Sequence, residues 1–318
     1  MARAALDGLR AYQDAPAPAG MREAPAIAEV SGTRLTDHGG TGPPMILVPS
    51  LINPPLILDL DPEVSLTGAI AAMGRRALLV DWGPASARSE LDVAGHIEQR
   101  LLPLIDSLDE LPVLLGYCLG GTMAVAAAAL RPLAGLITLA APWDFSHYPD
   151  AARASLEGMW HNSESVARRL GALPMEVLQA AFWSLDPERT VGKFAHFGTL
   201  DPASPESRRF VELEEWANGG EPLPCRAAIE LIQTLFRDNA SGRGCWKVAG
   251  RQVSPPTGLP MLHCTAANDR IAPAATAPPG ERIEIASGHV GMIVGSKRLA
   301  LHRAIGHFLA QAGGPGAA

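Results

Sequence analysis

Short apolar runs alternate with helical stretches along most of this chain, and this alternation restricts its fold more than any other feature. Most of the runs are bounded by Gly, Pro or charged residues, as is typical of strands that are buried on both faces. The predicted strands cover residues 45–48, 76–80, 113–116, 136–140, 260–265 and 282–285, and the predicted helices cover 64–74, 89–108 and 120–131. This order predicts a parallel sheet built from βαβ units.

The pattern changes between residues 145 and 255, where helical segments dominate. Of the 16 aromatic residues, 12 fall between Trp143 and Trp246. We expect a helical cap inserted over one end of the sheet, which forms either a second small core or a lid that lines an apolar substrate channel. The rest of the chain is interpreted as a loosely ordered lead-in, residues 1–24, and a core made of residues 25–144 and 256–318.

Composition excludes several classes of protein. The 318 residues are 47% hydrophobic, which is enough for a large core, and the formal net charge of −7 disfavours a nucleic-acid or anionic-membrane surface. Charges interrupt the N-terminus, and Arg131 and Pro132 interrupt the most apolar stretch, so we expect neither a secretory signal nor a transmembrane helix. The four cysteines form no C-x-x-C pair, which indicates individual thiols. A cytoplasmic protein is expected.

Residues 113–123 read V-L-L-G-Y-C-L-G-G-T-M, a pattern of strand, sharp turn and helix with Cys118 at the turn. This is the G-x-S-x-G nucleophile elbow of α/β-hydrolases, with cysteine in place of serine. Gly116 and Gly120 lack a Cβ, so that strand and helix approach closely enough to leave the nucleophile on a strained turn. The helix dipole at this position favours a thiolate, which predicts a reactive cysteine rather than a core one.

α/β-Hydrolases provide an acid and then a base after the nucleophile. Asp269 follows the predicted strand 260–265, and His289 lies in a loop beyond the last predicted strand. Because both positions lie at the C-terminal ends of successive strands, we expect a triad of Cys118, Asp269 and His289. The predicted fold is an α/β-hydrolase with a mainly parallel sheet and an inserted helical cap. Asp144, which follows another strand, remains an alternative acid.

No residue pattern indicates a cofactor or a metal. His302 and His307 are separated by roughly 140° around the predicted terminal helix, so they do not share a face as paired metal ligands would. The glycines at 39–42 precede no helix, which indicates a turn rather than a phosphate loop, and a dinucleotide fingerprint is absent. His263 and Cys264 lie within a predicted strand and are interpreted as core residues.

Seven motifs between residues 46 and 291 support a more specific interpretation. They are I-L-V-P-S-L-I-N-P-P-L-I-L-D-L-D-P at 46–62, L-L-V-D-W-G at 78–83, G-Y-C-L-G-G-T at 116–122, A-P-W-D-F at 141–145, W-A-N-G-G-E-P-L-P at 216–224, F-R-D-N at 236–239 and G-H-V-G at 288–291. In these motifs the chain resembles the polyhydroxyalkanoate synthases, particularly the short catalytic subunits of the two-component type. The resemblance implies that Cys118 is the acylated nucleophile, with Asp269 and His289 as its partners.

A cysteine nucleophile suits acyl transfer from thioesters. Attack on an acyl-CoA exchanges one thioester for another, so the acyl-enzyme stays reactive toward an incoming alcohol if water is excluded. We expect His289 to take the Cys118 proton and later to activate the hydroxyl of a 3-hydroxyacyl group, while Asp269 orients the imidazole. The backbone N–H groups of Leu119 and Ile52 are the expected oxyanion donors.

The sequence therefore predicts an acyltransferase that polymerises 3-hydroxyacyl-CoA into polyester and releases CoA, with no bound cofactor. The alternatives are a thioesterase or esterase with the same triad, and a non-polymerising granule-associated homologue. One departure from the family is that only 19 residues, including a Pro-rich stretch, separate Asp269 from His289. The acyl chain length, a homodimer or second synthase subunit as partner, and a position at the surface of polyester granules all stay open.

Overall fold

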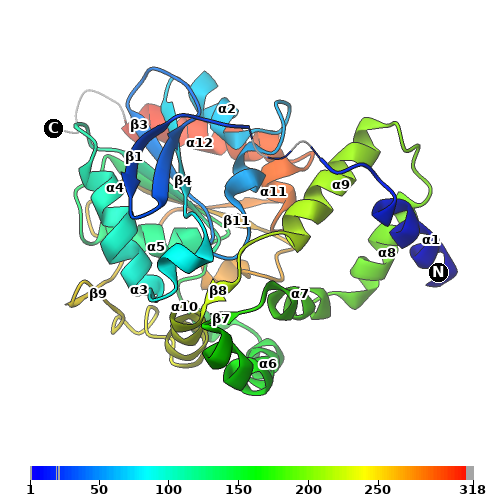
Figure 1. Ribbon diagram of the computed structural model, residues 1–318. Coiled ribbons are helices and arrows are strands. Elements are labelled where there is room, and N and C mark those ends of the chain that lie inside the picture. Colours follow the sequence, from blue (N-terminus) through cyan, green and yellow to red (C-terminus); the bar gives the residue numbers. More distant parts are fainter. Residues whose placement is uncertain (1, 19, 21, 313–318) are drawn as a thin grey trace.

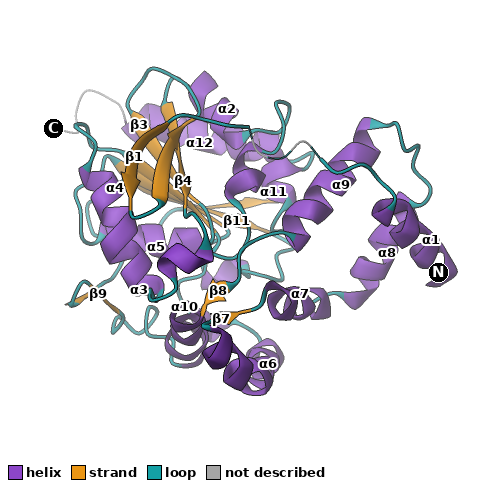
Figure 2. Ribbon diagram, viewed as in Figure 1, coloured by secondary structure: helices purple, strands orange, loops and turns teal. Residues whose placement is uncertain are grey.

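An eight-stranded sheet forms the centre of the structure, a computed structural model that describes residues 2–18, 20 and 22–312 (Figures 1 and 2). Its strand order is β1-β2-β4-β3-β5-β6-β11-β12, in which β2 is antiparallel to both of its neighbours and all other neighbours are parallel. The strands are β1 (Ala26–Val30), β2 (Thr33–Asp37), β3 (Pro44–Val48), β4 (Arg76–Asp81), β5 (Val113–Tyr117), β6 (Gly135–Leu139), β11 (Met261–Ala266) and β12 (Arg282–Ile285). The predicted, mainly parallel sheet is confirmed.

Two apolar cores lie on opposite faces of this sheet, because successive residues of a strand point to opposite sides. In β3, Met45 and Leu47 belong to one core, whereas Ile46 and Val48 belong to the other. All residues of β3, β5 and β6 are buried, which is why these strands appear in the sequence as continuous apolar runs.

Helices cover both faces (Figure 1). On one face lie α2 (Leu66–Ala72), α11 (Gly291–Val294) and α12 (Arg298–Ala312). On the other lie α3 (Val93–His96), the π-helical turn η3 (Ile97–Leu101), α4 (Leu102–Asp106) and α5 (Leu119–Ala128). Short 3₁₀ turns are η1 (Pro55–Asp59), η2 (Ala85–Arg88), η4 (Phe145–His147) and η6 (Ala274–Thr276).

Residues 145–255, which we call the cap segment, add no strand to this sheet. The main helices of the segment are α6 (Asp150–Leu170), α7 (Met175–Ser184), α8 (Pro187–Phe197), α9 (Pro205–Asn218), α10 (Cys225–Ile229) and the π-helix η5 (Glu230–Arg237). Two short strand pairs accompany them, β7 (Ala172–Leu173) with β8 (Leu223–Pro224), and β9 (Lys247–Val248) with β10 (Arg251–Gln252). None of the helices in the described part of the chain combines the length and apolar character that a membrane-spanning helix requires.

The entry of the cap segment is tied to its later part by hydrogen bonds. Asn239 accepts from the backbone N–H of Phe145 through Oδ1 and donates from Nδ2 to Asp144 Oδ1, both at 2.8 Å. The Ser241 hydroxyl donates to the carbonyl oxygen of Trp143 at 2.5 Å. Because these bonds link residues nearly 100 positions apart, they hold the entry of the cap segment against residues 239–241, in its later part.

The N-terminal segment differs from the prediction. Residues 1–24 were expected to be loosely ordered, but Ala2–Gln13 form helix α1, which packs against α8 (Figure 1). Ala, Leu and Arg residues favour this helix, and Pro16 and Pro18 follow its end. The Tyr12 hydroxyl donates to Glu215 Oε1 at 2.6 Å, so α1 also contacts α9. Strands β1 and β2 were not predicted either, because neither is a continuous apolar run.

Candidate active site

Cys118 lies at the turn between β5 and α5 with a backbone conformation that side chains rarely adopt. Its φ is +55° and its ψ is −128°. Such a conformation costs of the order of 1–3 kcal/mol and persists only where the surroundings enforce it. Here the Cys118 N–H donates to the carbonyl oxygen of Leu139, and its carbonyl oxygen accepts from the N–H of Gly121, both at 2.9 Å. The turn predicted from the sequence is therefore present.

Two glycines allow this turn to form. A Cβ on Gly116 would overlap the backbone of Gly121 at the start of α5, and a Cβ on Gly120 would overlap the carbonyl oxygens of Val48 and Pro49. Any larger residue at either position would push α5 away from the sheet. The half-buried Cys118 side chain is thereby directed from the start of the helix into the cavities described below.

His289 and Asp269 form a buried pair next to Cys118. The Nδ1 atom of His289 lies 2.7 Å from Asp269 Oδ2. The other carboxylate oxygen, Oδ1, accepts from the backbone N–H groups of Ile271 and Ala272, each at 2.8 Å. Because an ionised carboxylate only accepts, Nδ1 carries the proton in this pair, and Nε2 is left for Cys118. The structure therefore brings the three residues predicted for the triad together.

The charges at this site change the pKa of His289. Burial lowers it, but the charges of Cys118 and Asp269 and the hydrogen bonds to both side chains outweigh burial and raise it to about 10. The ring of Tyr117 lies against the imidazole, with ring centroids 5.1 Å apart. The imidazolium is thus favoured as long as a negative sulfur faces it.

The two predicted oxyanion donors differ in whether their N–H group already has an acceptor. Leu119 is the first residue of α5, so its N–H has no acceptor within the helix. The N–H of Ile52, in the loop after β3, donates to the Ser50 hydroxyl at 3.2 Å. An oxyanion at Cys118 would therefore compete with Ser50 for the Ile52 donor.

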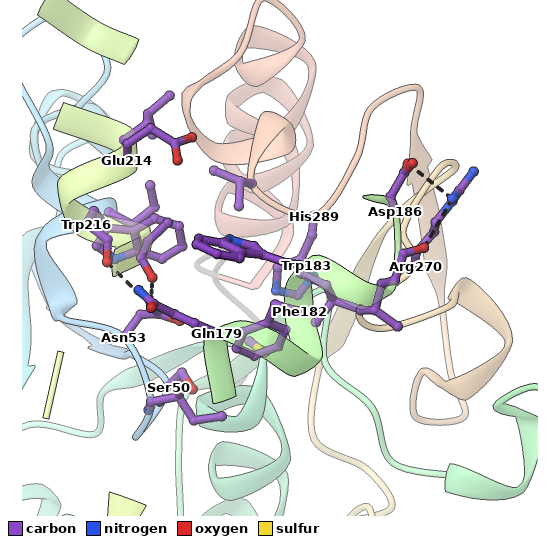
Figure 3. A pocket seen from close by; sticks show the side chains of 18 of the residues that line it. Ser50, Asn53, Gln179, Phe182, Trp183, Asp186, Glu214, Trp216, Arg270 and His289 are labelled. Carbon is purple, nitrogen blue, oxygen red and sulfur yellow. Dashed lines mark hydrogen bonds and ion pairs between the residues drawn. The ribbon is translucent and has the colours of Figure 1, made fainter. Parts of the chain in front are cut away.

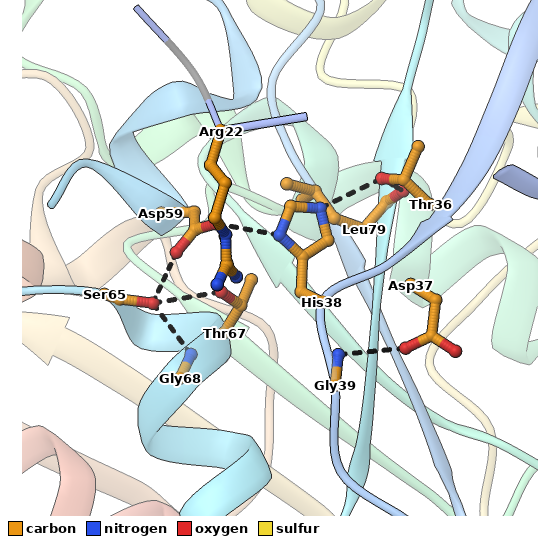
Figure 4. A network of polar contacts seen from close by, with 10 residues as sticks. All are labelled: Arg22, Thr36, Asp37, His38, Gly39, Asp59, Ser65, Thr67, Gly68 and Leu79. Atoms are coloured by element: carbon orange, nitrogen blue, oxygen red, sulfur yellow. Dashed lines mark hydrogen bonds and ion pairs between the residues drawn. The ribbon is translucent and has the colours of Figure 1, made fainter. Parts of the chain in front are cut away.

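A buried polar network anchors the loop that carries Ile52 (Figure 4). His38 Nδ1 lies 2.8 Å from Asp59 Oδ2 at the end of η1, and the Ser65 hydroxyl donates to Asp59 Oδ1 at 2.5 Å. Burial favours the protonated carboxyl of Asp59, but hydrogen bonds from His38, Ser65 and Thr67 outweigh it and lower its pKa. The end of this loop is therefore fixed to the sheet by the charged carboxylate of Asp59, both of whose oxygens accept hydrogen bonds.

Two cavities meet at Cys118. The first, of about 330 Å³, we call the polar cavity because it contains charged side chains as well as His289; its polar lining includes Ser50, Asn53, Gln179, Asp186, Arg189, Lys193, Glu214 and Arg270. Figure 3 shows Arg270 paired with Asp186 at its edge and Asn53 turned toward Trp216. The second, of about 320 Å³, we call the apolar cavity; it lies under the cap segment and is lined mainly by Leu, Ile, Met and aromatic side chains.

The other residues considered from the sequence lie elsewhere. Asp144 accepts hydrogen bonds from Ser146 and Asn239, and the carboxylate at His289 is that of Asp269 instead. His263 is buried between Thr138 Oγ1 and the carbonyl oxygen of Pro279, and burial raises the pKa of Cys264 to about 12. No cluster of His, Cys, Asp or Glu that could hold a metal occurs among residues 2–18, 20 and 22–312.

Several residues of the site were not found from the sequence. Tyr117 precedes the cysteine, but nothing in its position indicates that its ring packs on His289. Phe182, from α7, lines both cavities beside Cys118, although it is 64 positions away along the chain. Arg189 belongs to the same cap segment. The helical pattern of the cap segment does not indicate which face of each helix turns toward Cys118.

Comparisons with known proteins agree with the motifs. No protein-family model matches the chain. It is 26% identical over 292 residues to the Poly(3-hydroxyalkanoate) polymerase subunit PhaC of Haloarcula marismortui, over 85% of this chain and 61% of that protein. It is 27% identical over 275 residues to the protein of the same name from Haloferax mediterranei, over 80% of this chain and 56% of that protein. The chain thus spans about three-fifths of the length of these relatives.

Solved structures agree with the fold. The crystal structure of a hydrolase from Pseudomonas aeruginosa PA01 matches with a TM-score of 0.55 at 18% identity, over 92% of this chain and 99% of that one. An α/β-hydrolase fold protein from Nakamurella multipartita matches with a TM-score of 0.52 at 19% identity, over 92% of this chain and 100% of that one. The chain therefore has the α/β-hydrolase fold, and its sequence resembles that of poly(3-hydroxyalkanoate) polymerase subunits, as the motifs predicted.

Proposed function

We propose that this protein is an acyltransferase that polymerises 3-hydroxyacyl-CoA through a covalent acyl-Cys118 intermediate. The observation that carries the proposal is the hydrogen-bonded His289–Asp269 pair beside a cysteine on a nucleophile elbow. The sequence relationship to polymerase subunits supports the substrate class.

The first half-reaction forms the acyl-enzyme. In the resting site His289 holds the Cys118 proton on Nε2, and the Sγ thiolate that faces this imidazolium attacks the thioester carbonyl carbon of the acyl-CoA. The N–H of Leu119 and that of Ile52, once released from Ser50, would hold the oxyanion. When the C–S bond to CoA breaks, the CoA sulfur accepts the proton from His289 and leaves as a free thiol. The acyl group remains on Cys118 as a thioester.

The second half-reaction transfers the acyl group to an alcohol. Acylation removes the negative sulfur that raises the pKa of His289, so the imidazole becomes a base at neutral pH. It then takes the proton of the 3-hydroxyl of another 3-hydroxyacyl group, whose oxygen attacks the acyl-Cys118 carbonyl. An ester bond forms, Cys118 leaves as a thiolate, and the imidazolium faces it again. Asp269 keeps the ring oriented throughout.

The cap segment would favour the alcohol over water as acceptor. Its helices supply most of the lining of the apolar cavity, including Phe182 beside Cys118. Exclusion of water from this space would protect the acyl-cysteine from hydrolysis. We assign residues 145–255 this lid role as part of the proposal.

The reaction products distinguish the proposed polymerase from a hydrolase. On incubation with 3-hydroxybutyryl-CoA, we expect CoA release to be matched by oligomeric or insoluble polyester, with little free 3-hydroxybutyrate, because acyl-Cys118 reacts with a hydroxyl. Cys118→Ala should abolish CoA release, and Cys245→Ala, at an exposed thiol, should leave it unchanged. Stoichiometric free acid without oligomer would contradict polymerisation, and CoA release by the Cys118→Ala variant would contradict the role of this cysteine.

The mechanism also predicts how the pKa of His289 depends on Cys118. Replacing Cys118 by Ala removes the strongest charge that raises this pKa, so the imidazole should titrate well below its native value of about 10. Because the pKa of His289 is raised in the folded state, protonation of its imidazole also increases the free energy of unfolding. This contribution is fully present below pH 6.5 and is lost as pH rises through about 10. NMR titration of the His289 ring in the native, Cys118→Ala and Cys245→Ala proteins measures the difference. An unchanged pKa in the Cys118→Ala protein would show that the two side chains are not coupled.

Alkylation tests the reactivity of the thiol without any substrate. Iodoacetamide should label Cys118 fastest, exposed Cys245 at an ordinary rate, and Cys225 and Cys264 slowly, because burial raises the pKa of both of these thiols. His289→Ala should slow labelling of Cys118 near neutral pH by roughly tenfold or more, and Asp269→Asn should slow it less. Peptide mapping across a pH series quantifies each cysteine. If Cys118 is labelled no faster than Cys245, or if its labelling rate is unaffected by His289→Ala, the His289–Asp269 pair does not activate the thiol.

A further inference from the structure

The apolar cavity extends from Cys118 under the cap segment and is suited to an alkyl chain. Its volume is about 320 Å³, and side chains from α6, η4 and η5 form much of its wall. These side chains include Phe145, Leu156, Met159, Leu231 and Phe236. The Tyr148 hydroxyl, also at this wall, already donates to the carbonyl oxygen of Ile271 at 2.8 Å. Ser155, Ser184 and Arg270 also line the cavity, but Ser184 donates to the carbonyl oxygen of Ala181 and Arg270 is paired with Asp186, so the wall offers mainly apolar contacts.

The polar cavity, which also reaches Cys118, is suited to the CoA moiety instead. Lys193 is paired with Glu214 at 2.7 Å and Arg270 with Asp186 at 3.1 Å, whereas the side chain of Arg189 has no carboxylate partner within the described residues. The guanidinium of Arg189 and the side-chain amides of Asn53 and Gln179 match the anionic and polar groups of CoA. A thioester at Cys118 would thus direct its CoA part and its acyl chain into different cavities.

We infer that the apolar cavity binds the alkyl chain of the substrate, and that the protein prefers 3-hydroxyacyl groups of roughly six to ten carbons over 3-hydroxybutyryl. This inference rests on the proposed function for the identity of the reacting group. Its basis in the structure is the size of the cavity. A dry cavity of about 150 Å³ binds benzene, so one of twice that volume holds a chain of more than six carbons.

We expect a longer acyl chain to bind more tightly, because it buries more apolar surface in the cavity. A 3-hydroxybutyryl group has a single methyl beyond its hydroxyl-bearing carbon, which leaves most of the cavity wall without contacts. Each further methylene that enters the cavity strengthens binding by up to roughly fourfold. Four added methylenes are therefore expected to strengthen binding by at least roughly tenfold, even where part of the chain stays in contact with water.

Thioether analogues of the substrate test this inference apart from turnover. S-octyl-CoA and S-butyl-CoA cannot acylate a thiol, and isothermal titration calorimetry gives the dissociation constant of each. We expect S-octyl-CoA to bind the native protein at least tenfold more tightly than S-butyl-CoA. Ala152→Phe places a ring in the apolar cavity and should reduce this ratio to below threefold. Ala154→Phe is the matched control, because Ala154 is exposed on the same helix, and it should keep the native ratio.

A second variant enlarges the apolar cavity instead of filling it. Met159→Ala enlarges the cavity and should increase the affinity for S-dodecyl-CoA relative to S-octyl-CoA, so the inference remains testable if Ala152→Phe does not fold. Equal affinities of the native protein for S-octyl-CoA and S-butyl-CoA would overturn the inference, as would a ratio unaffected by both cavity variants. A clear chain-length preference without any turnover of acyl-CoA would refute the proposed function and leave the assignment of the cavity intact.

Discussion

The positive φ of Cys118 is the constraint on which the rest of the site depends. A sharp turn at this point lets α5 begin directly above the sheet, with the sulfur at the N-terminal end of the helix. The backbone is held there by bonds to β6 and to the first turn of α5, and by two glycine contacts that exclude any Cβ. The strain at one residue is thus sustained by close packing across three strands, a common arrangement at functional sites.

Electrostatic coupling then connects the turn to two loops that are distant in sequence. Asp269 is held by two backbone N–H groups and by His289, so its charge is fixed in position. Sulfur and carboxylate together favour the imidazolium between them. Because one of these two anions disappears on acylation, the same histidine can stabilise a thiolate in one step and accept a proton in the next. This alternation is what an acyl transfer through cysteine requires.

Much of the core and its candidate triad could be predicted from the sequence. The strands of the parallel sheet are continuous apolar runs, and the elbow, the aspartate and the histidine follow strand ends in a fixed order, so their meeting point depends only on topology. The N-terminal helix and the antiparallel strands β1 and β2 were missed because polar or charged residues interrupt each of them, so none shows a comparable apolar run. The cap residues at the cavities were missed because their positions depend on how amphipathic helices pack, which periodicity alone does not specify. The contacts of Asn239 were missed for another reason, because its side chain joins two loops that no sequence pattern pairs.

The covalent intermediate is the central claim, and intact-protein mass spectrometry tests it most directly. The protein would be mixed with 3-hydroxyoctanoyl-CoA, quenched in acid within a second, and digested to locate any adduct. We predict a mass increase equal to one or more 3-hydroxyoctanoyl groups on the peptide that contains Cys118, and its absence from the Cys118→Ala protein. CoA release without any adduct on this peptide, or an adduct on Cys225, Cys245 or Cys264 instead, would contradict the account.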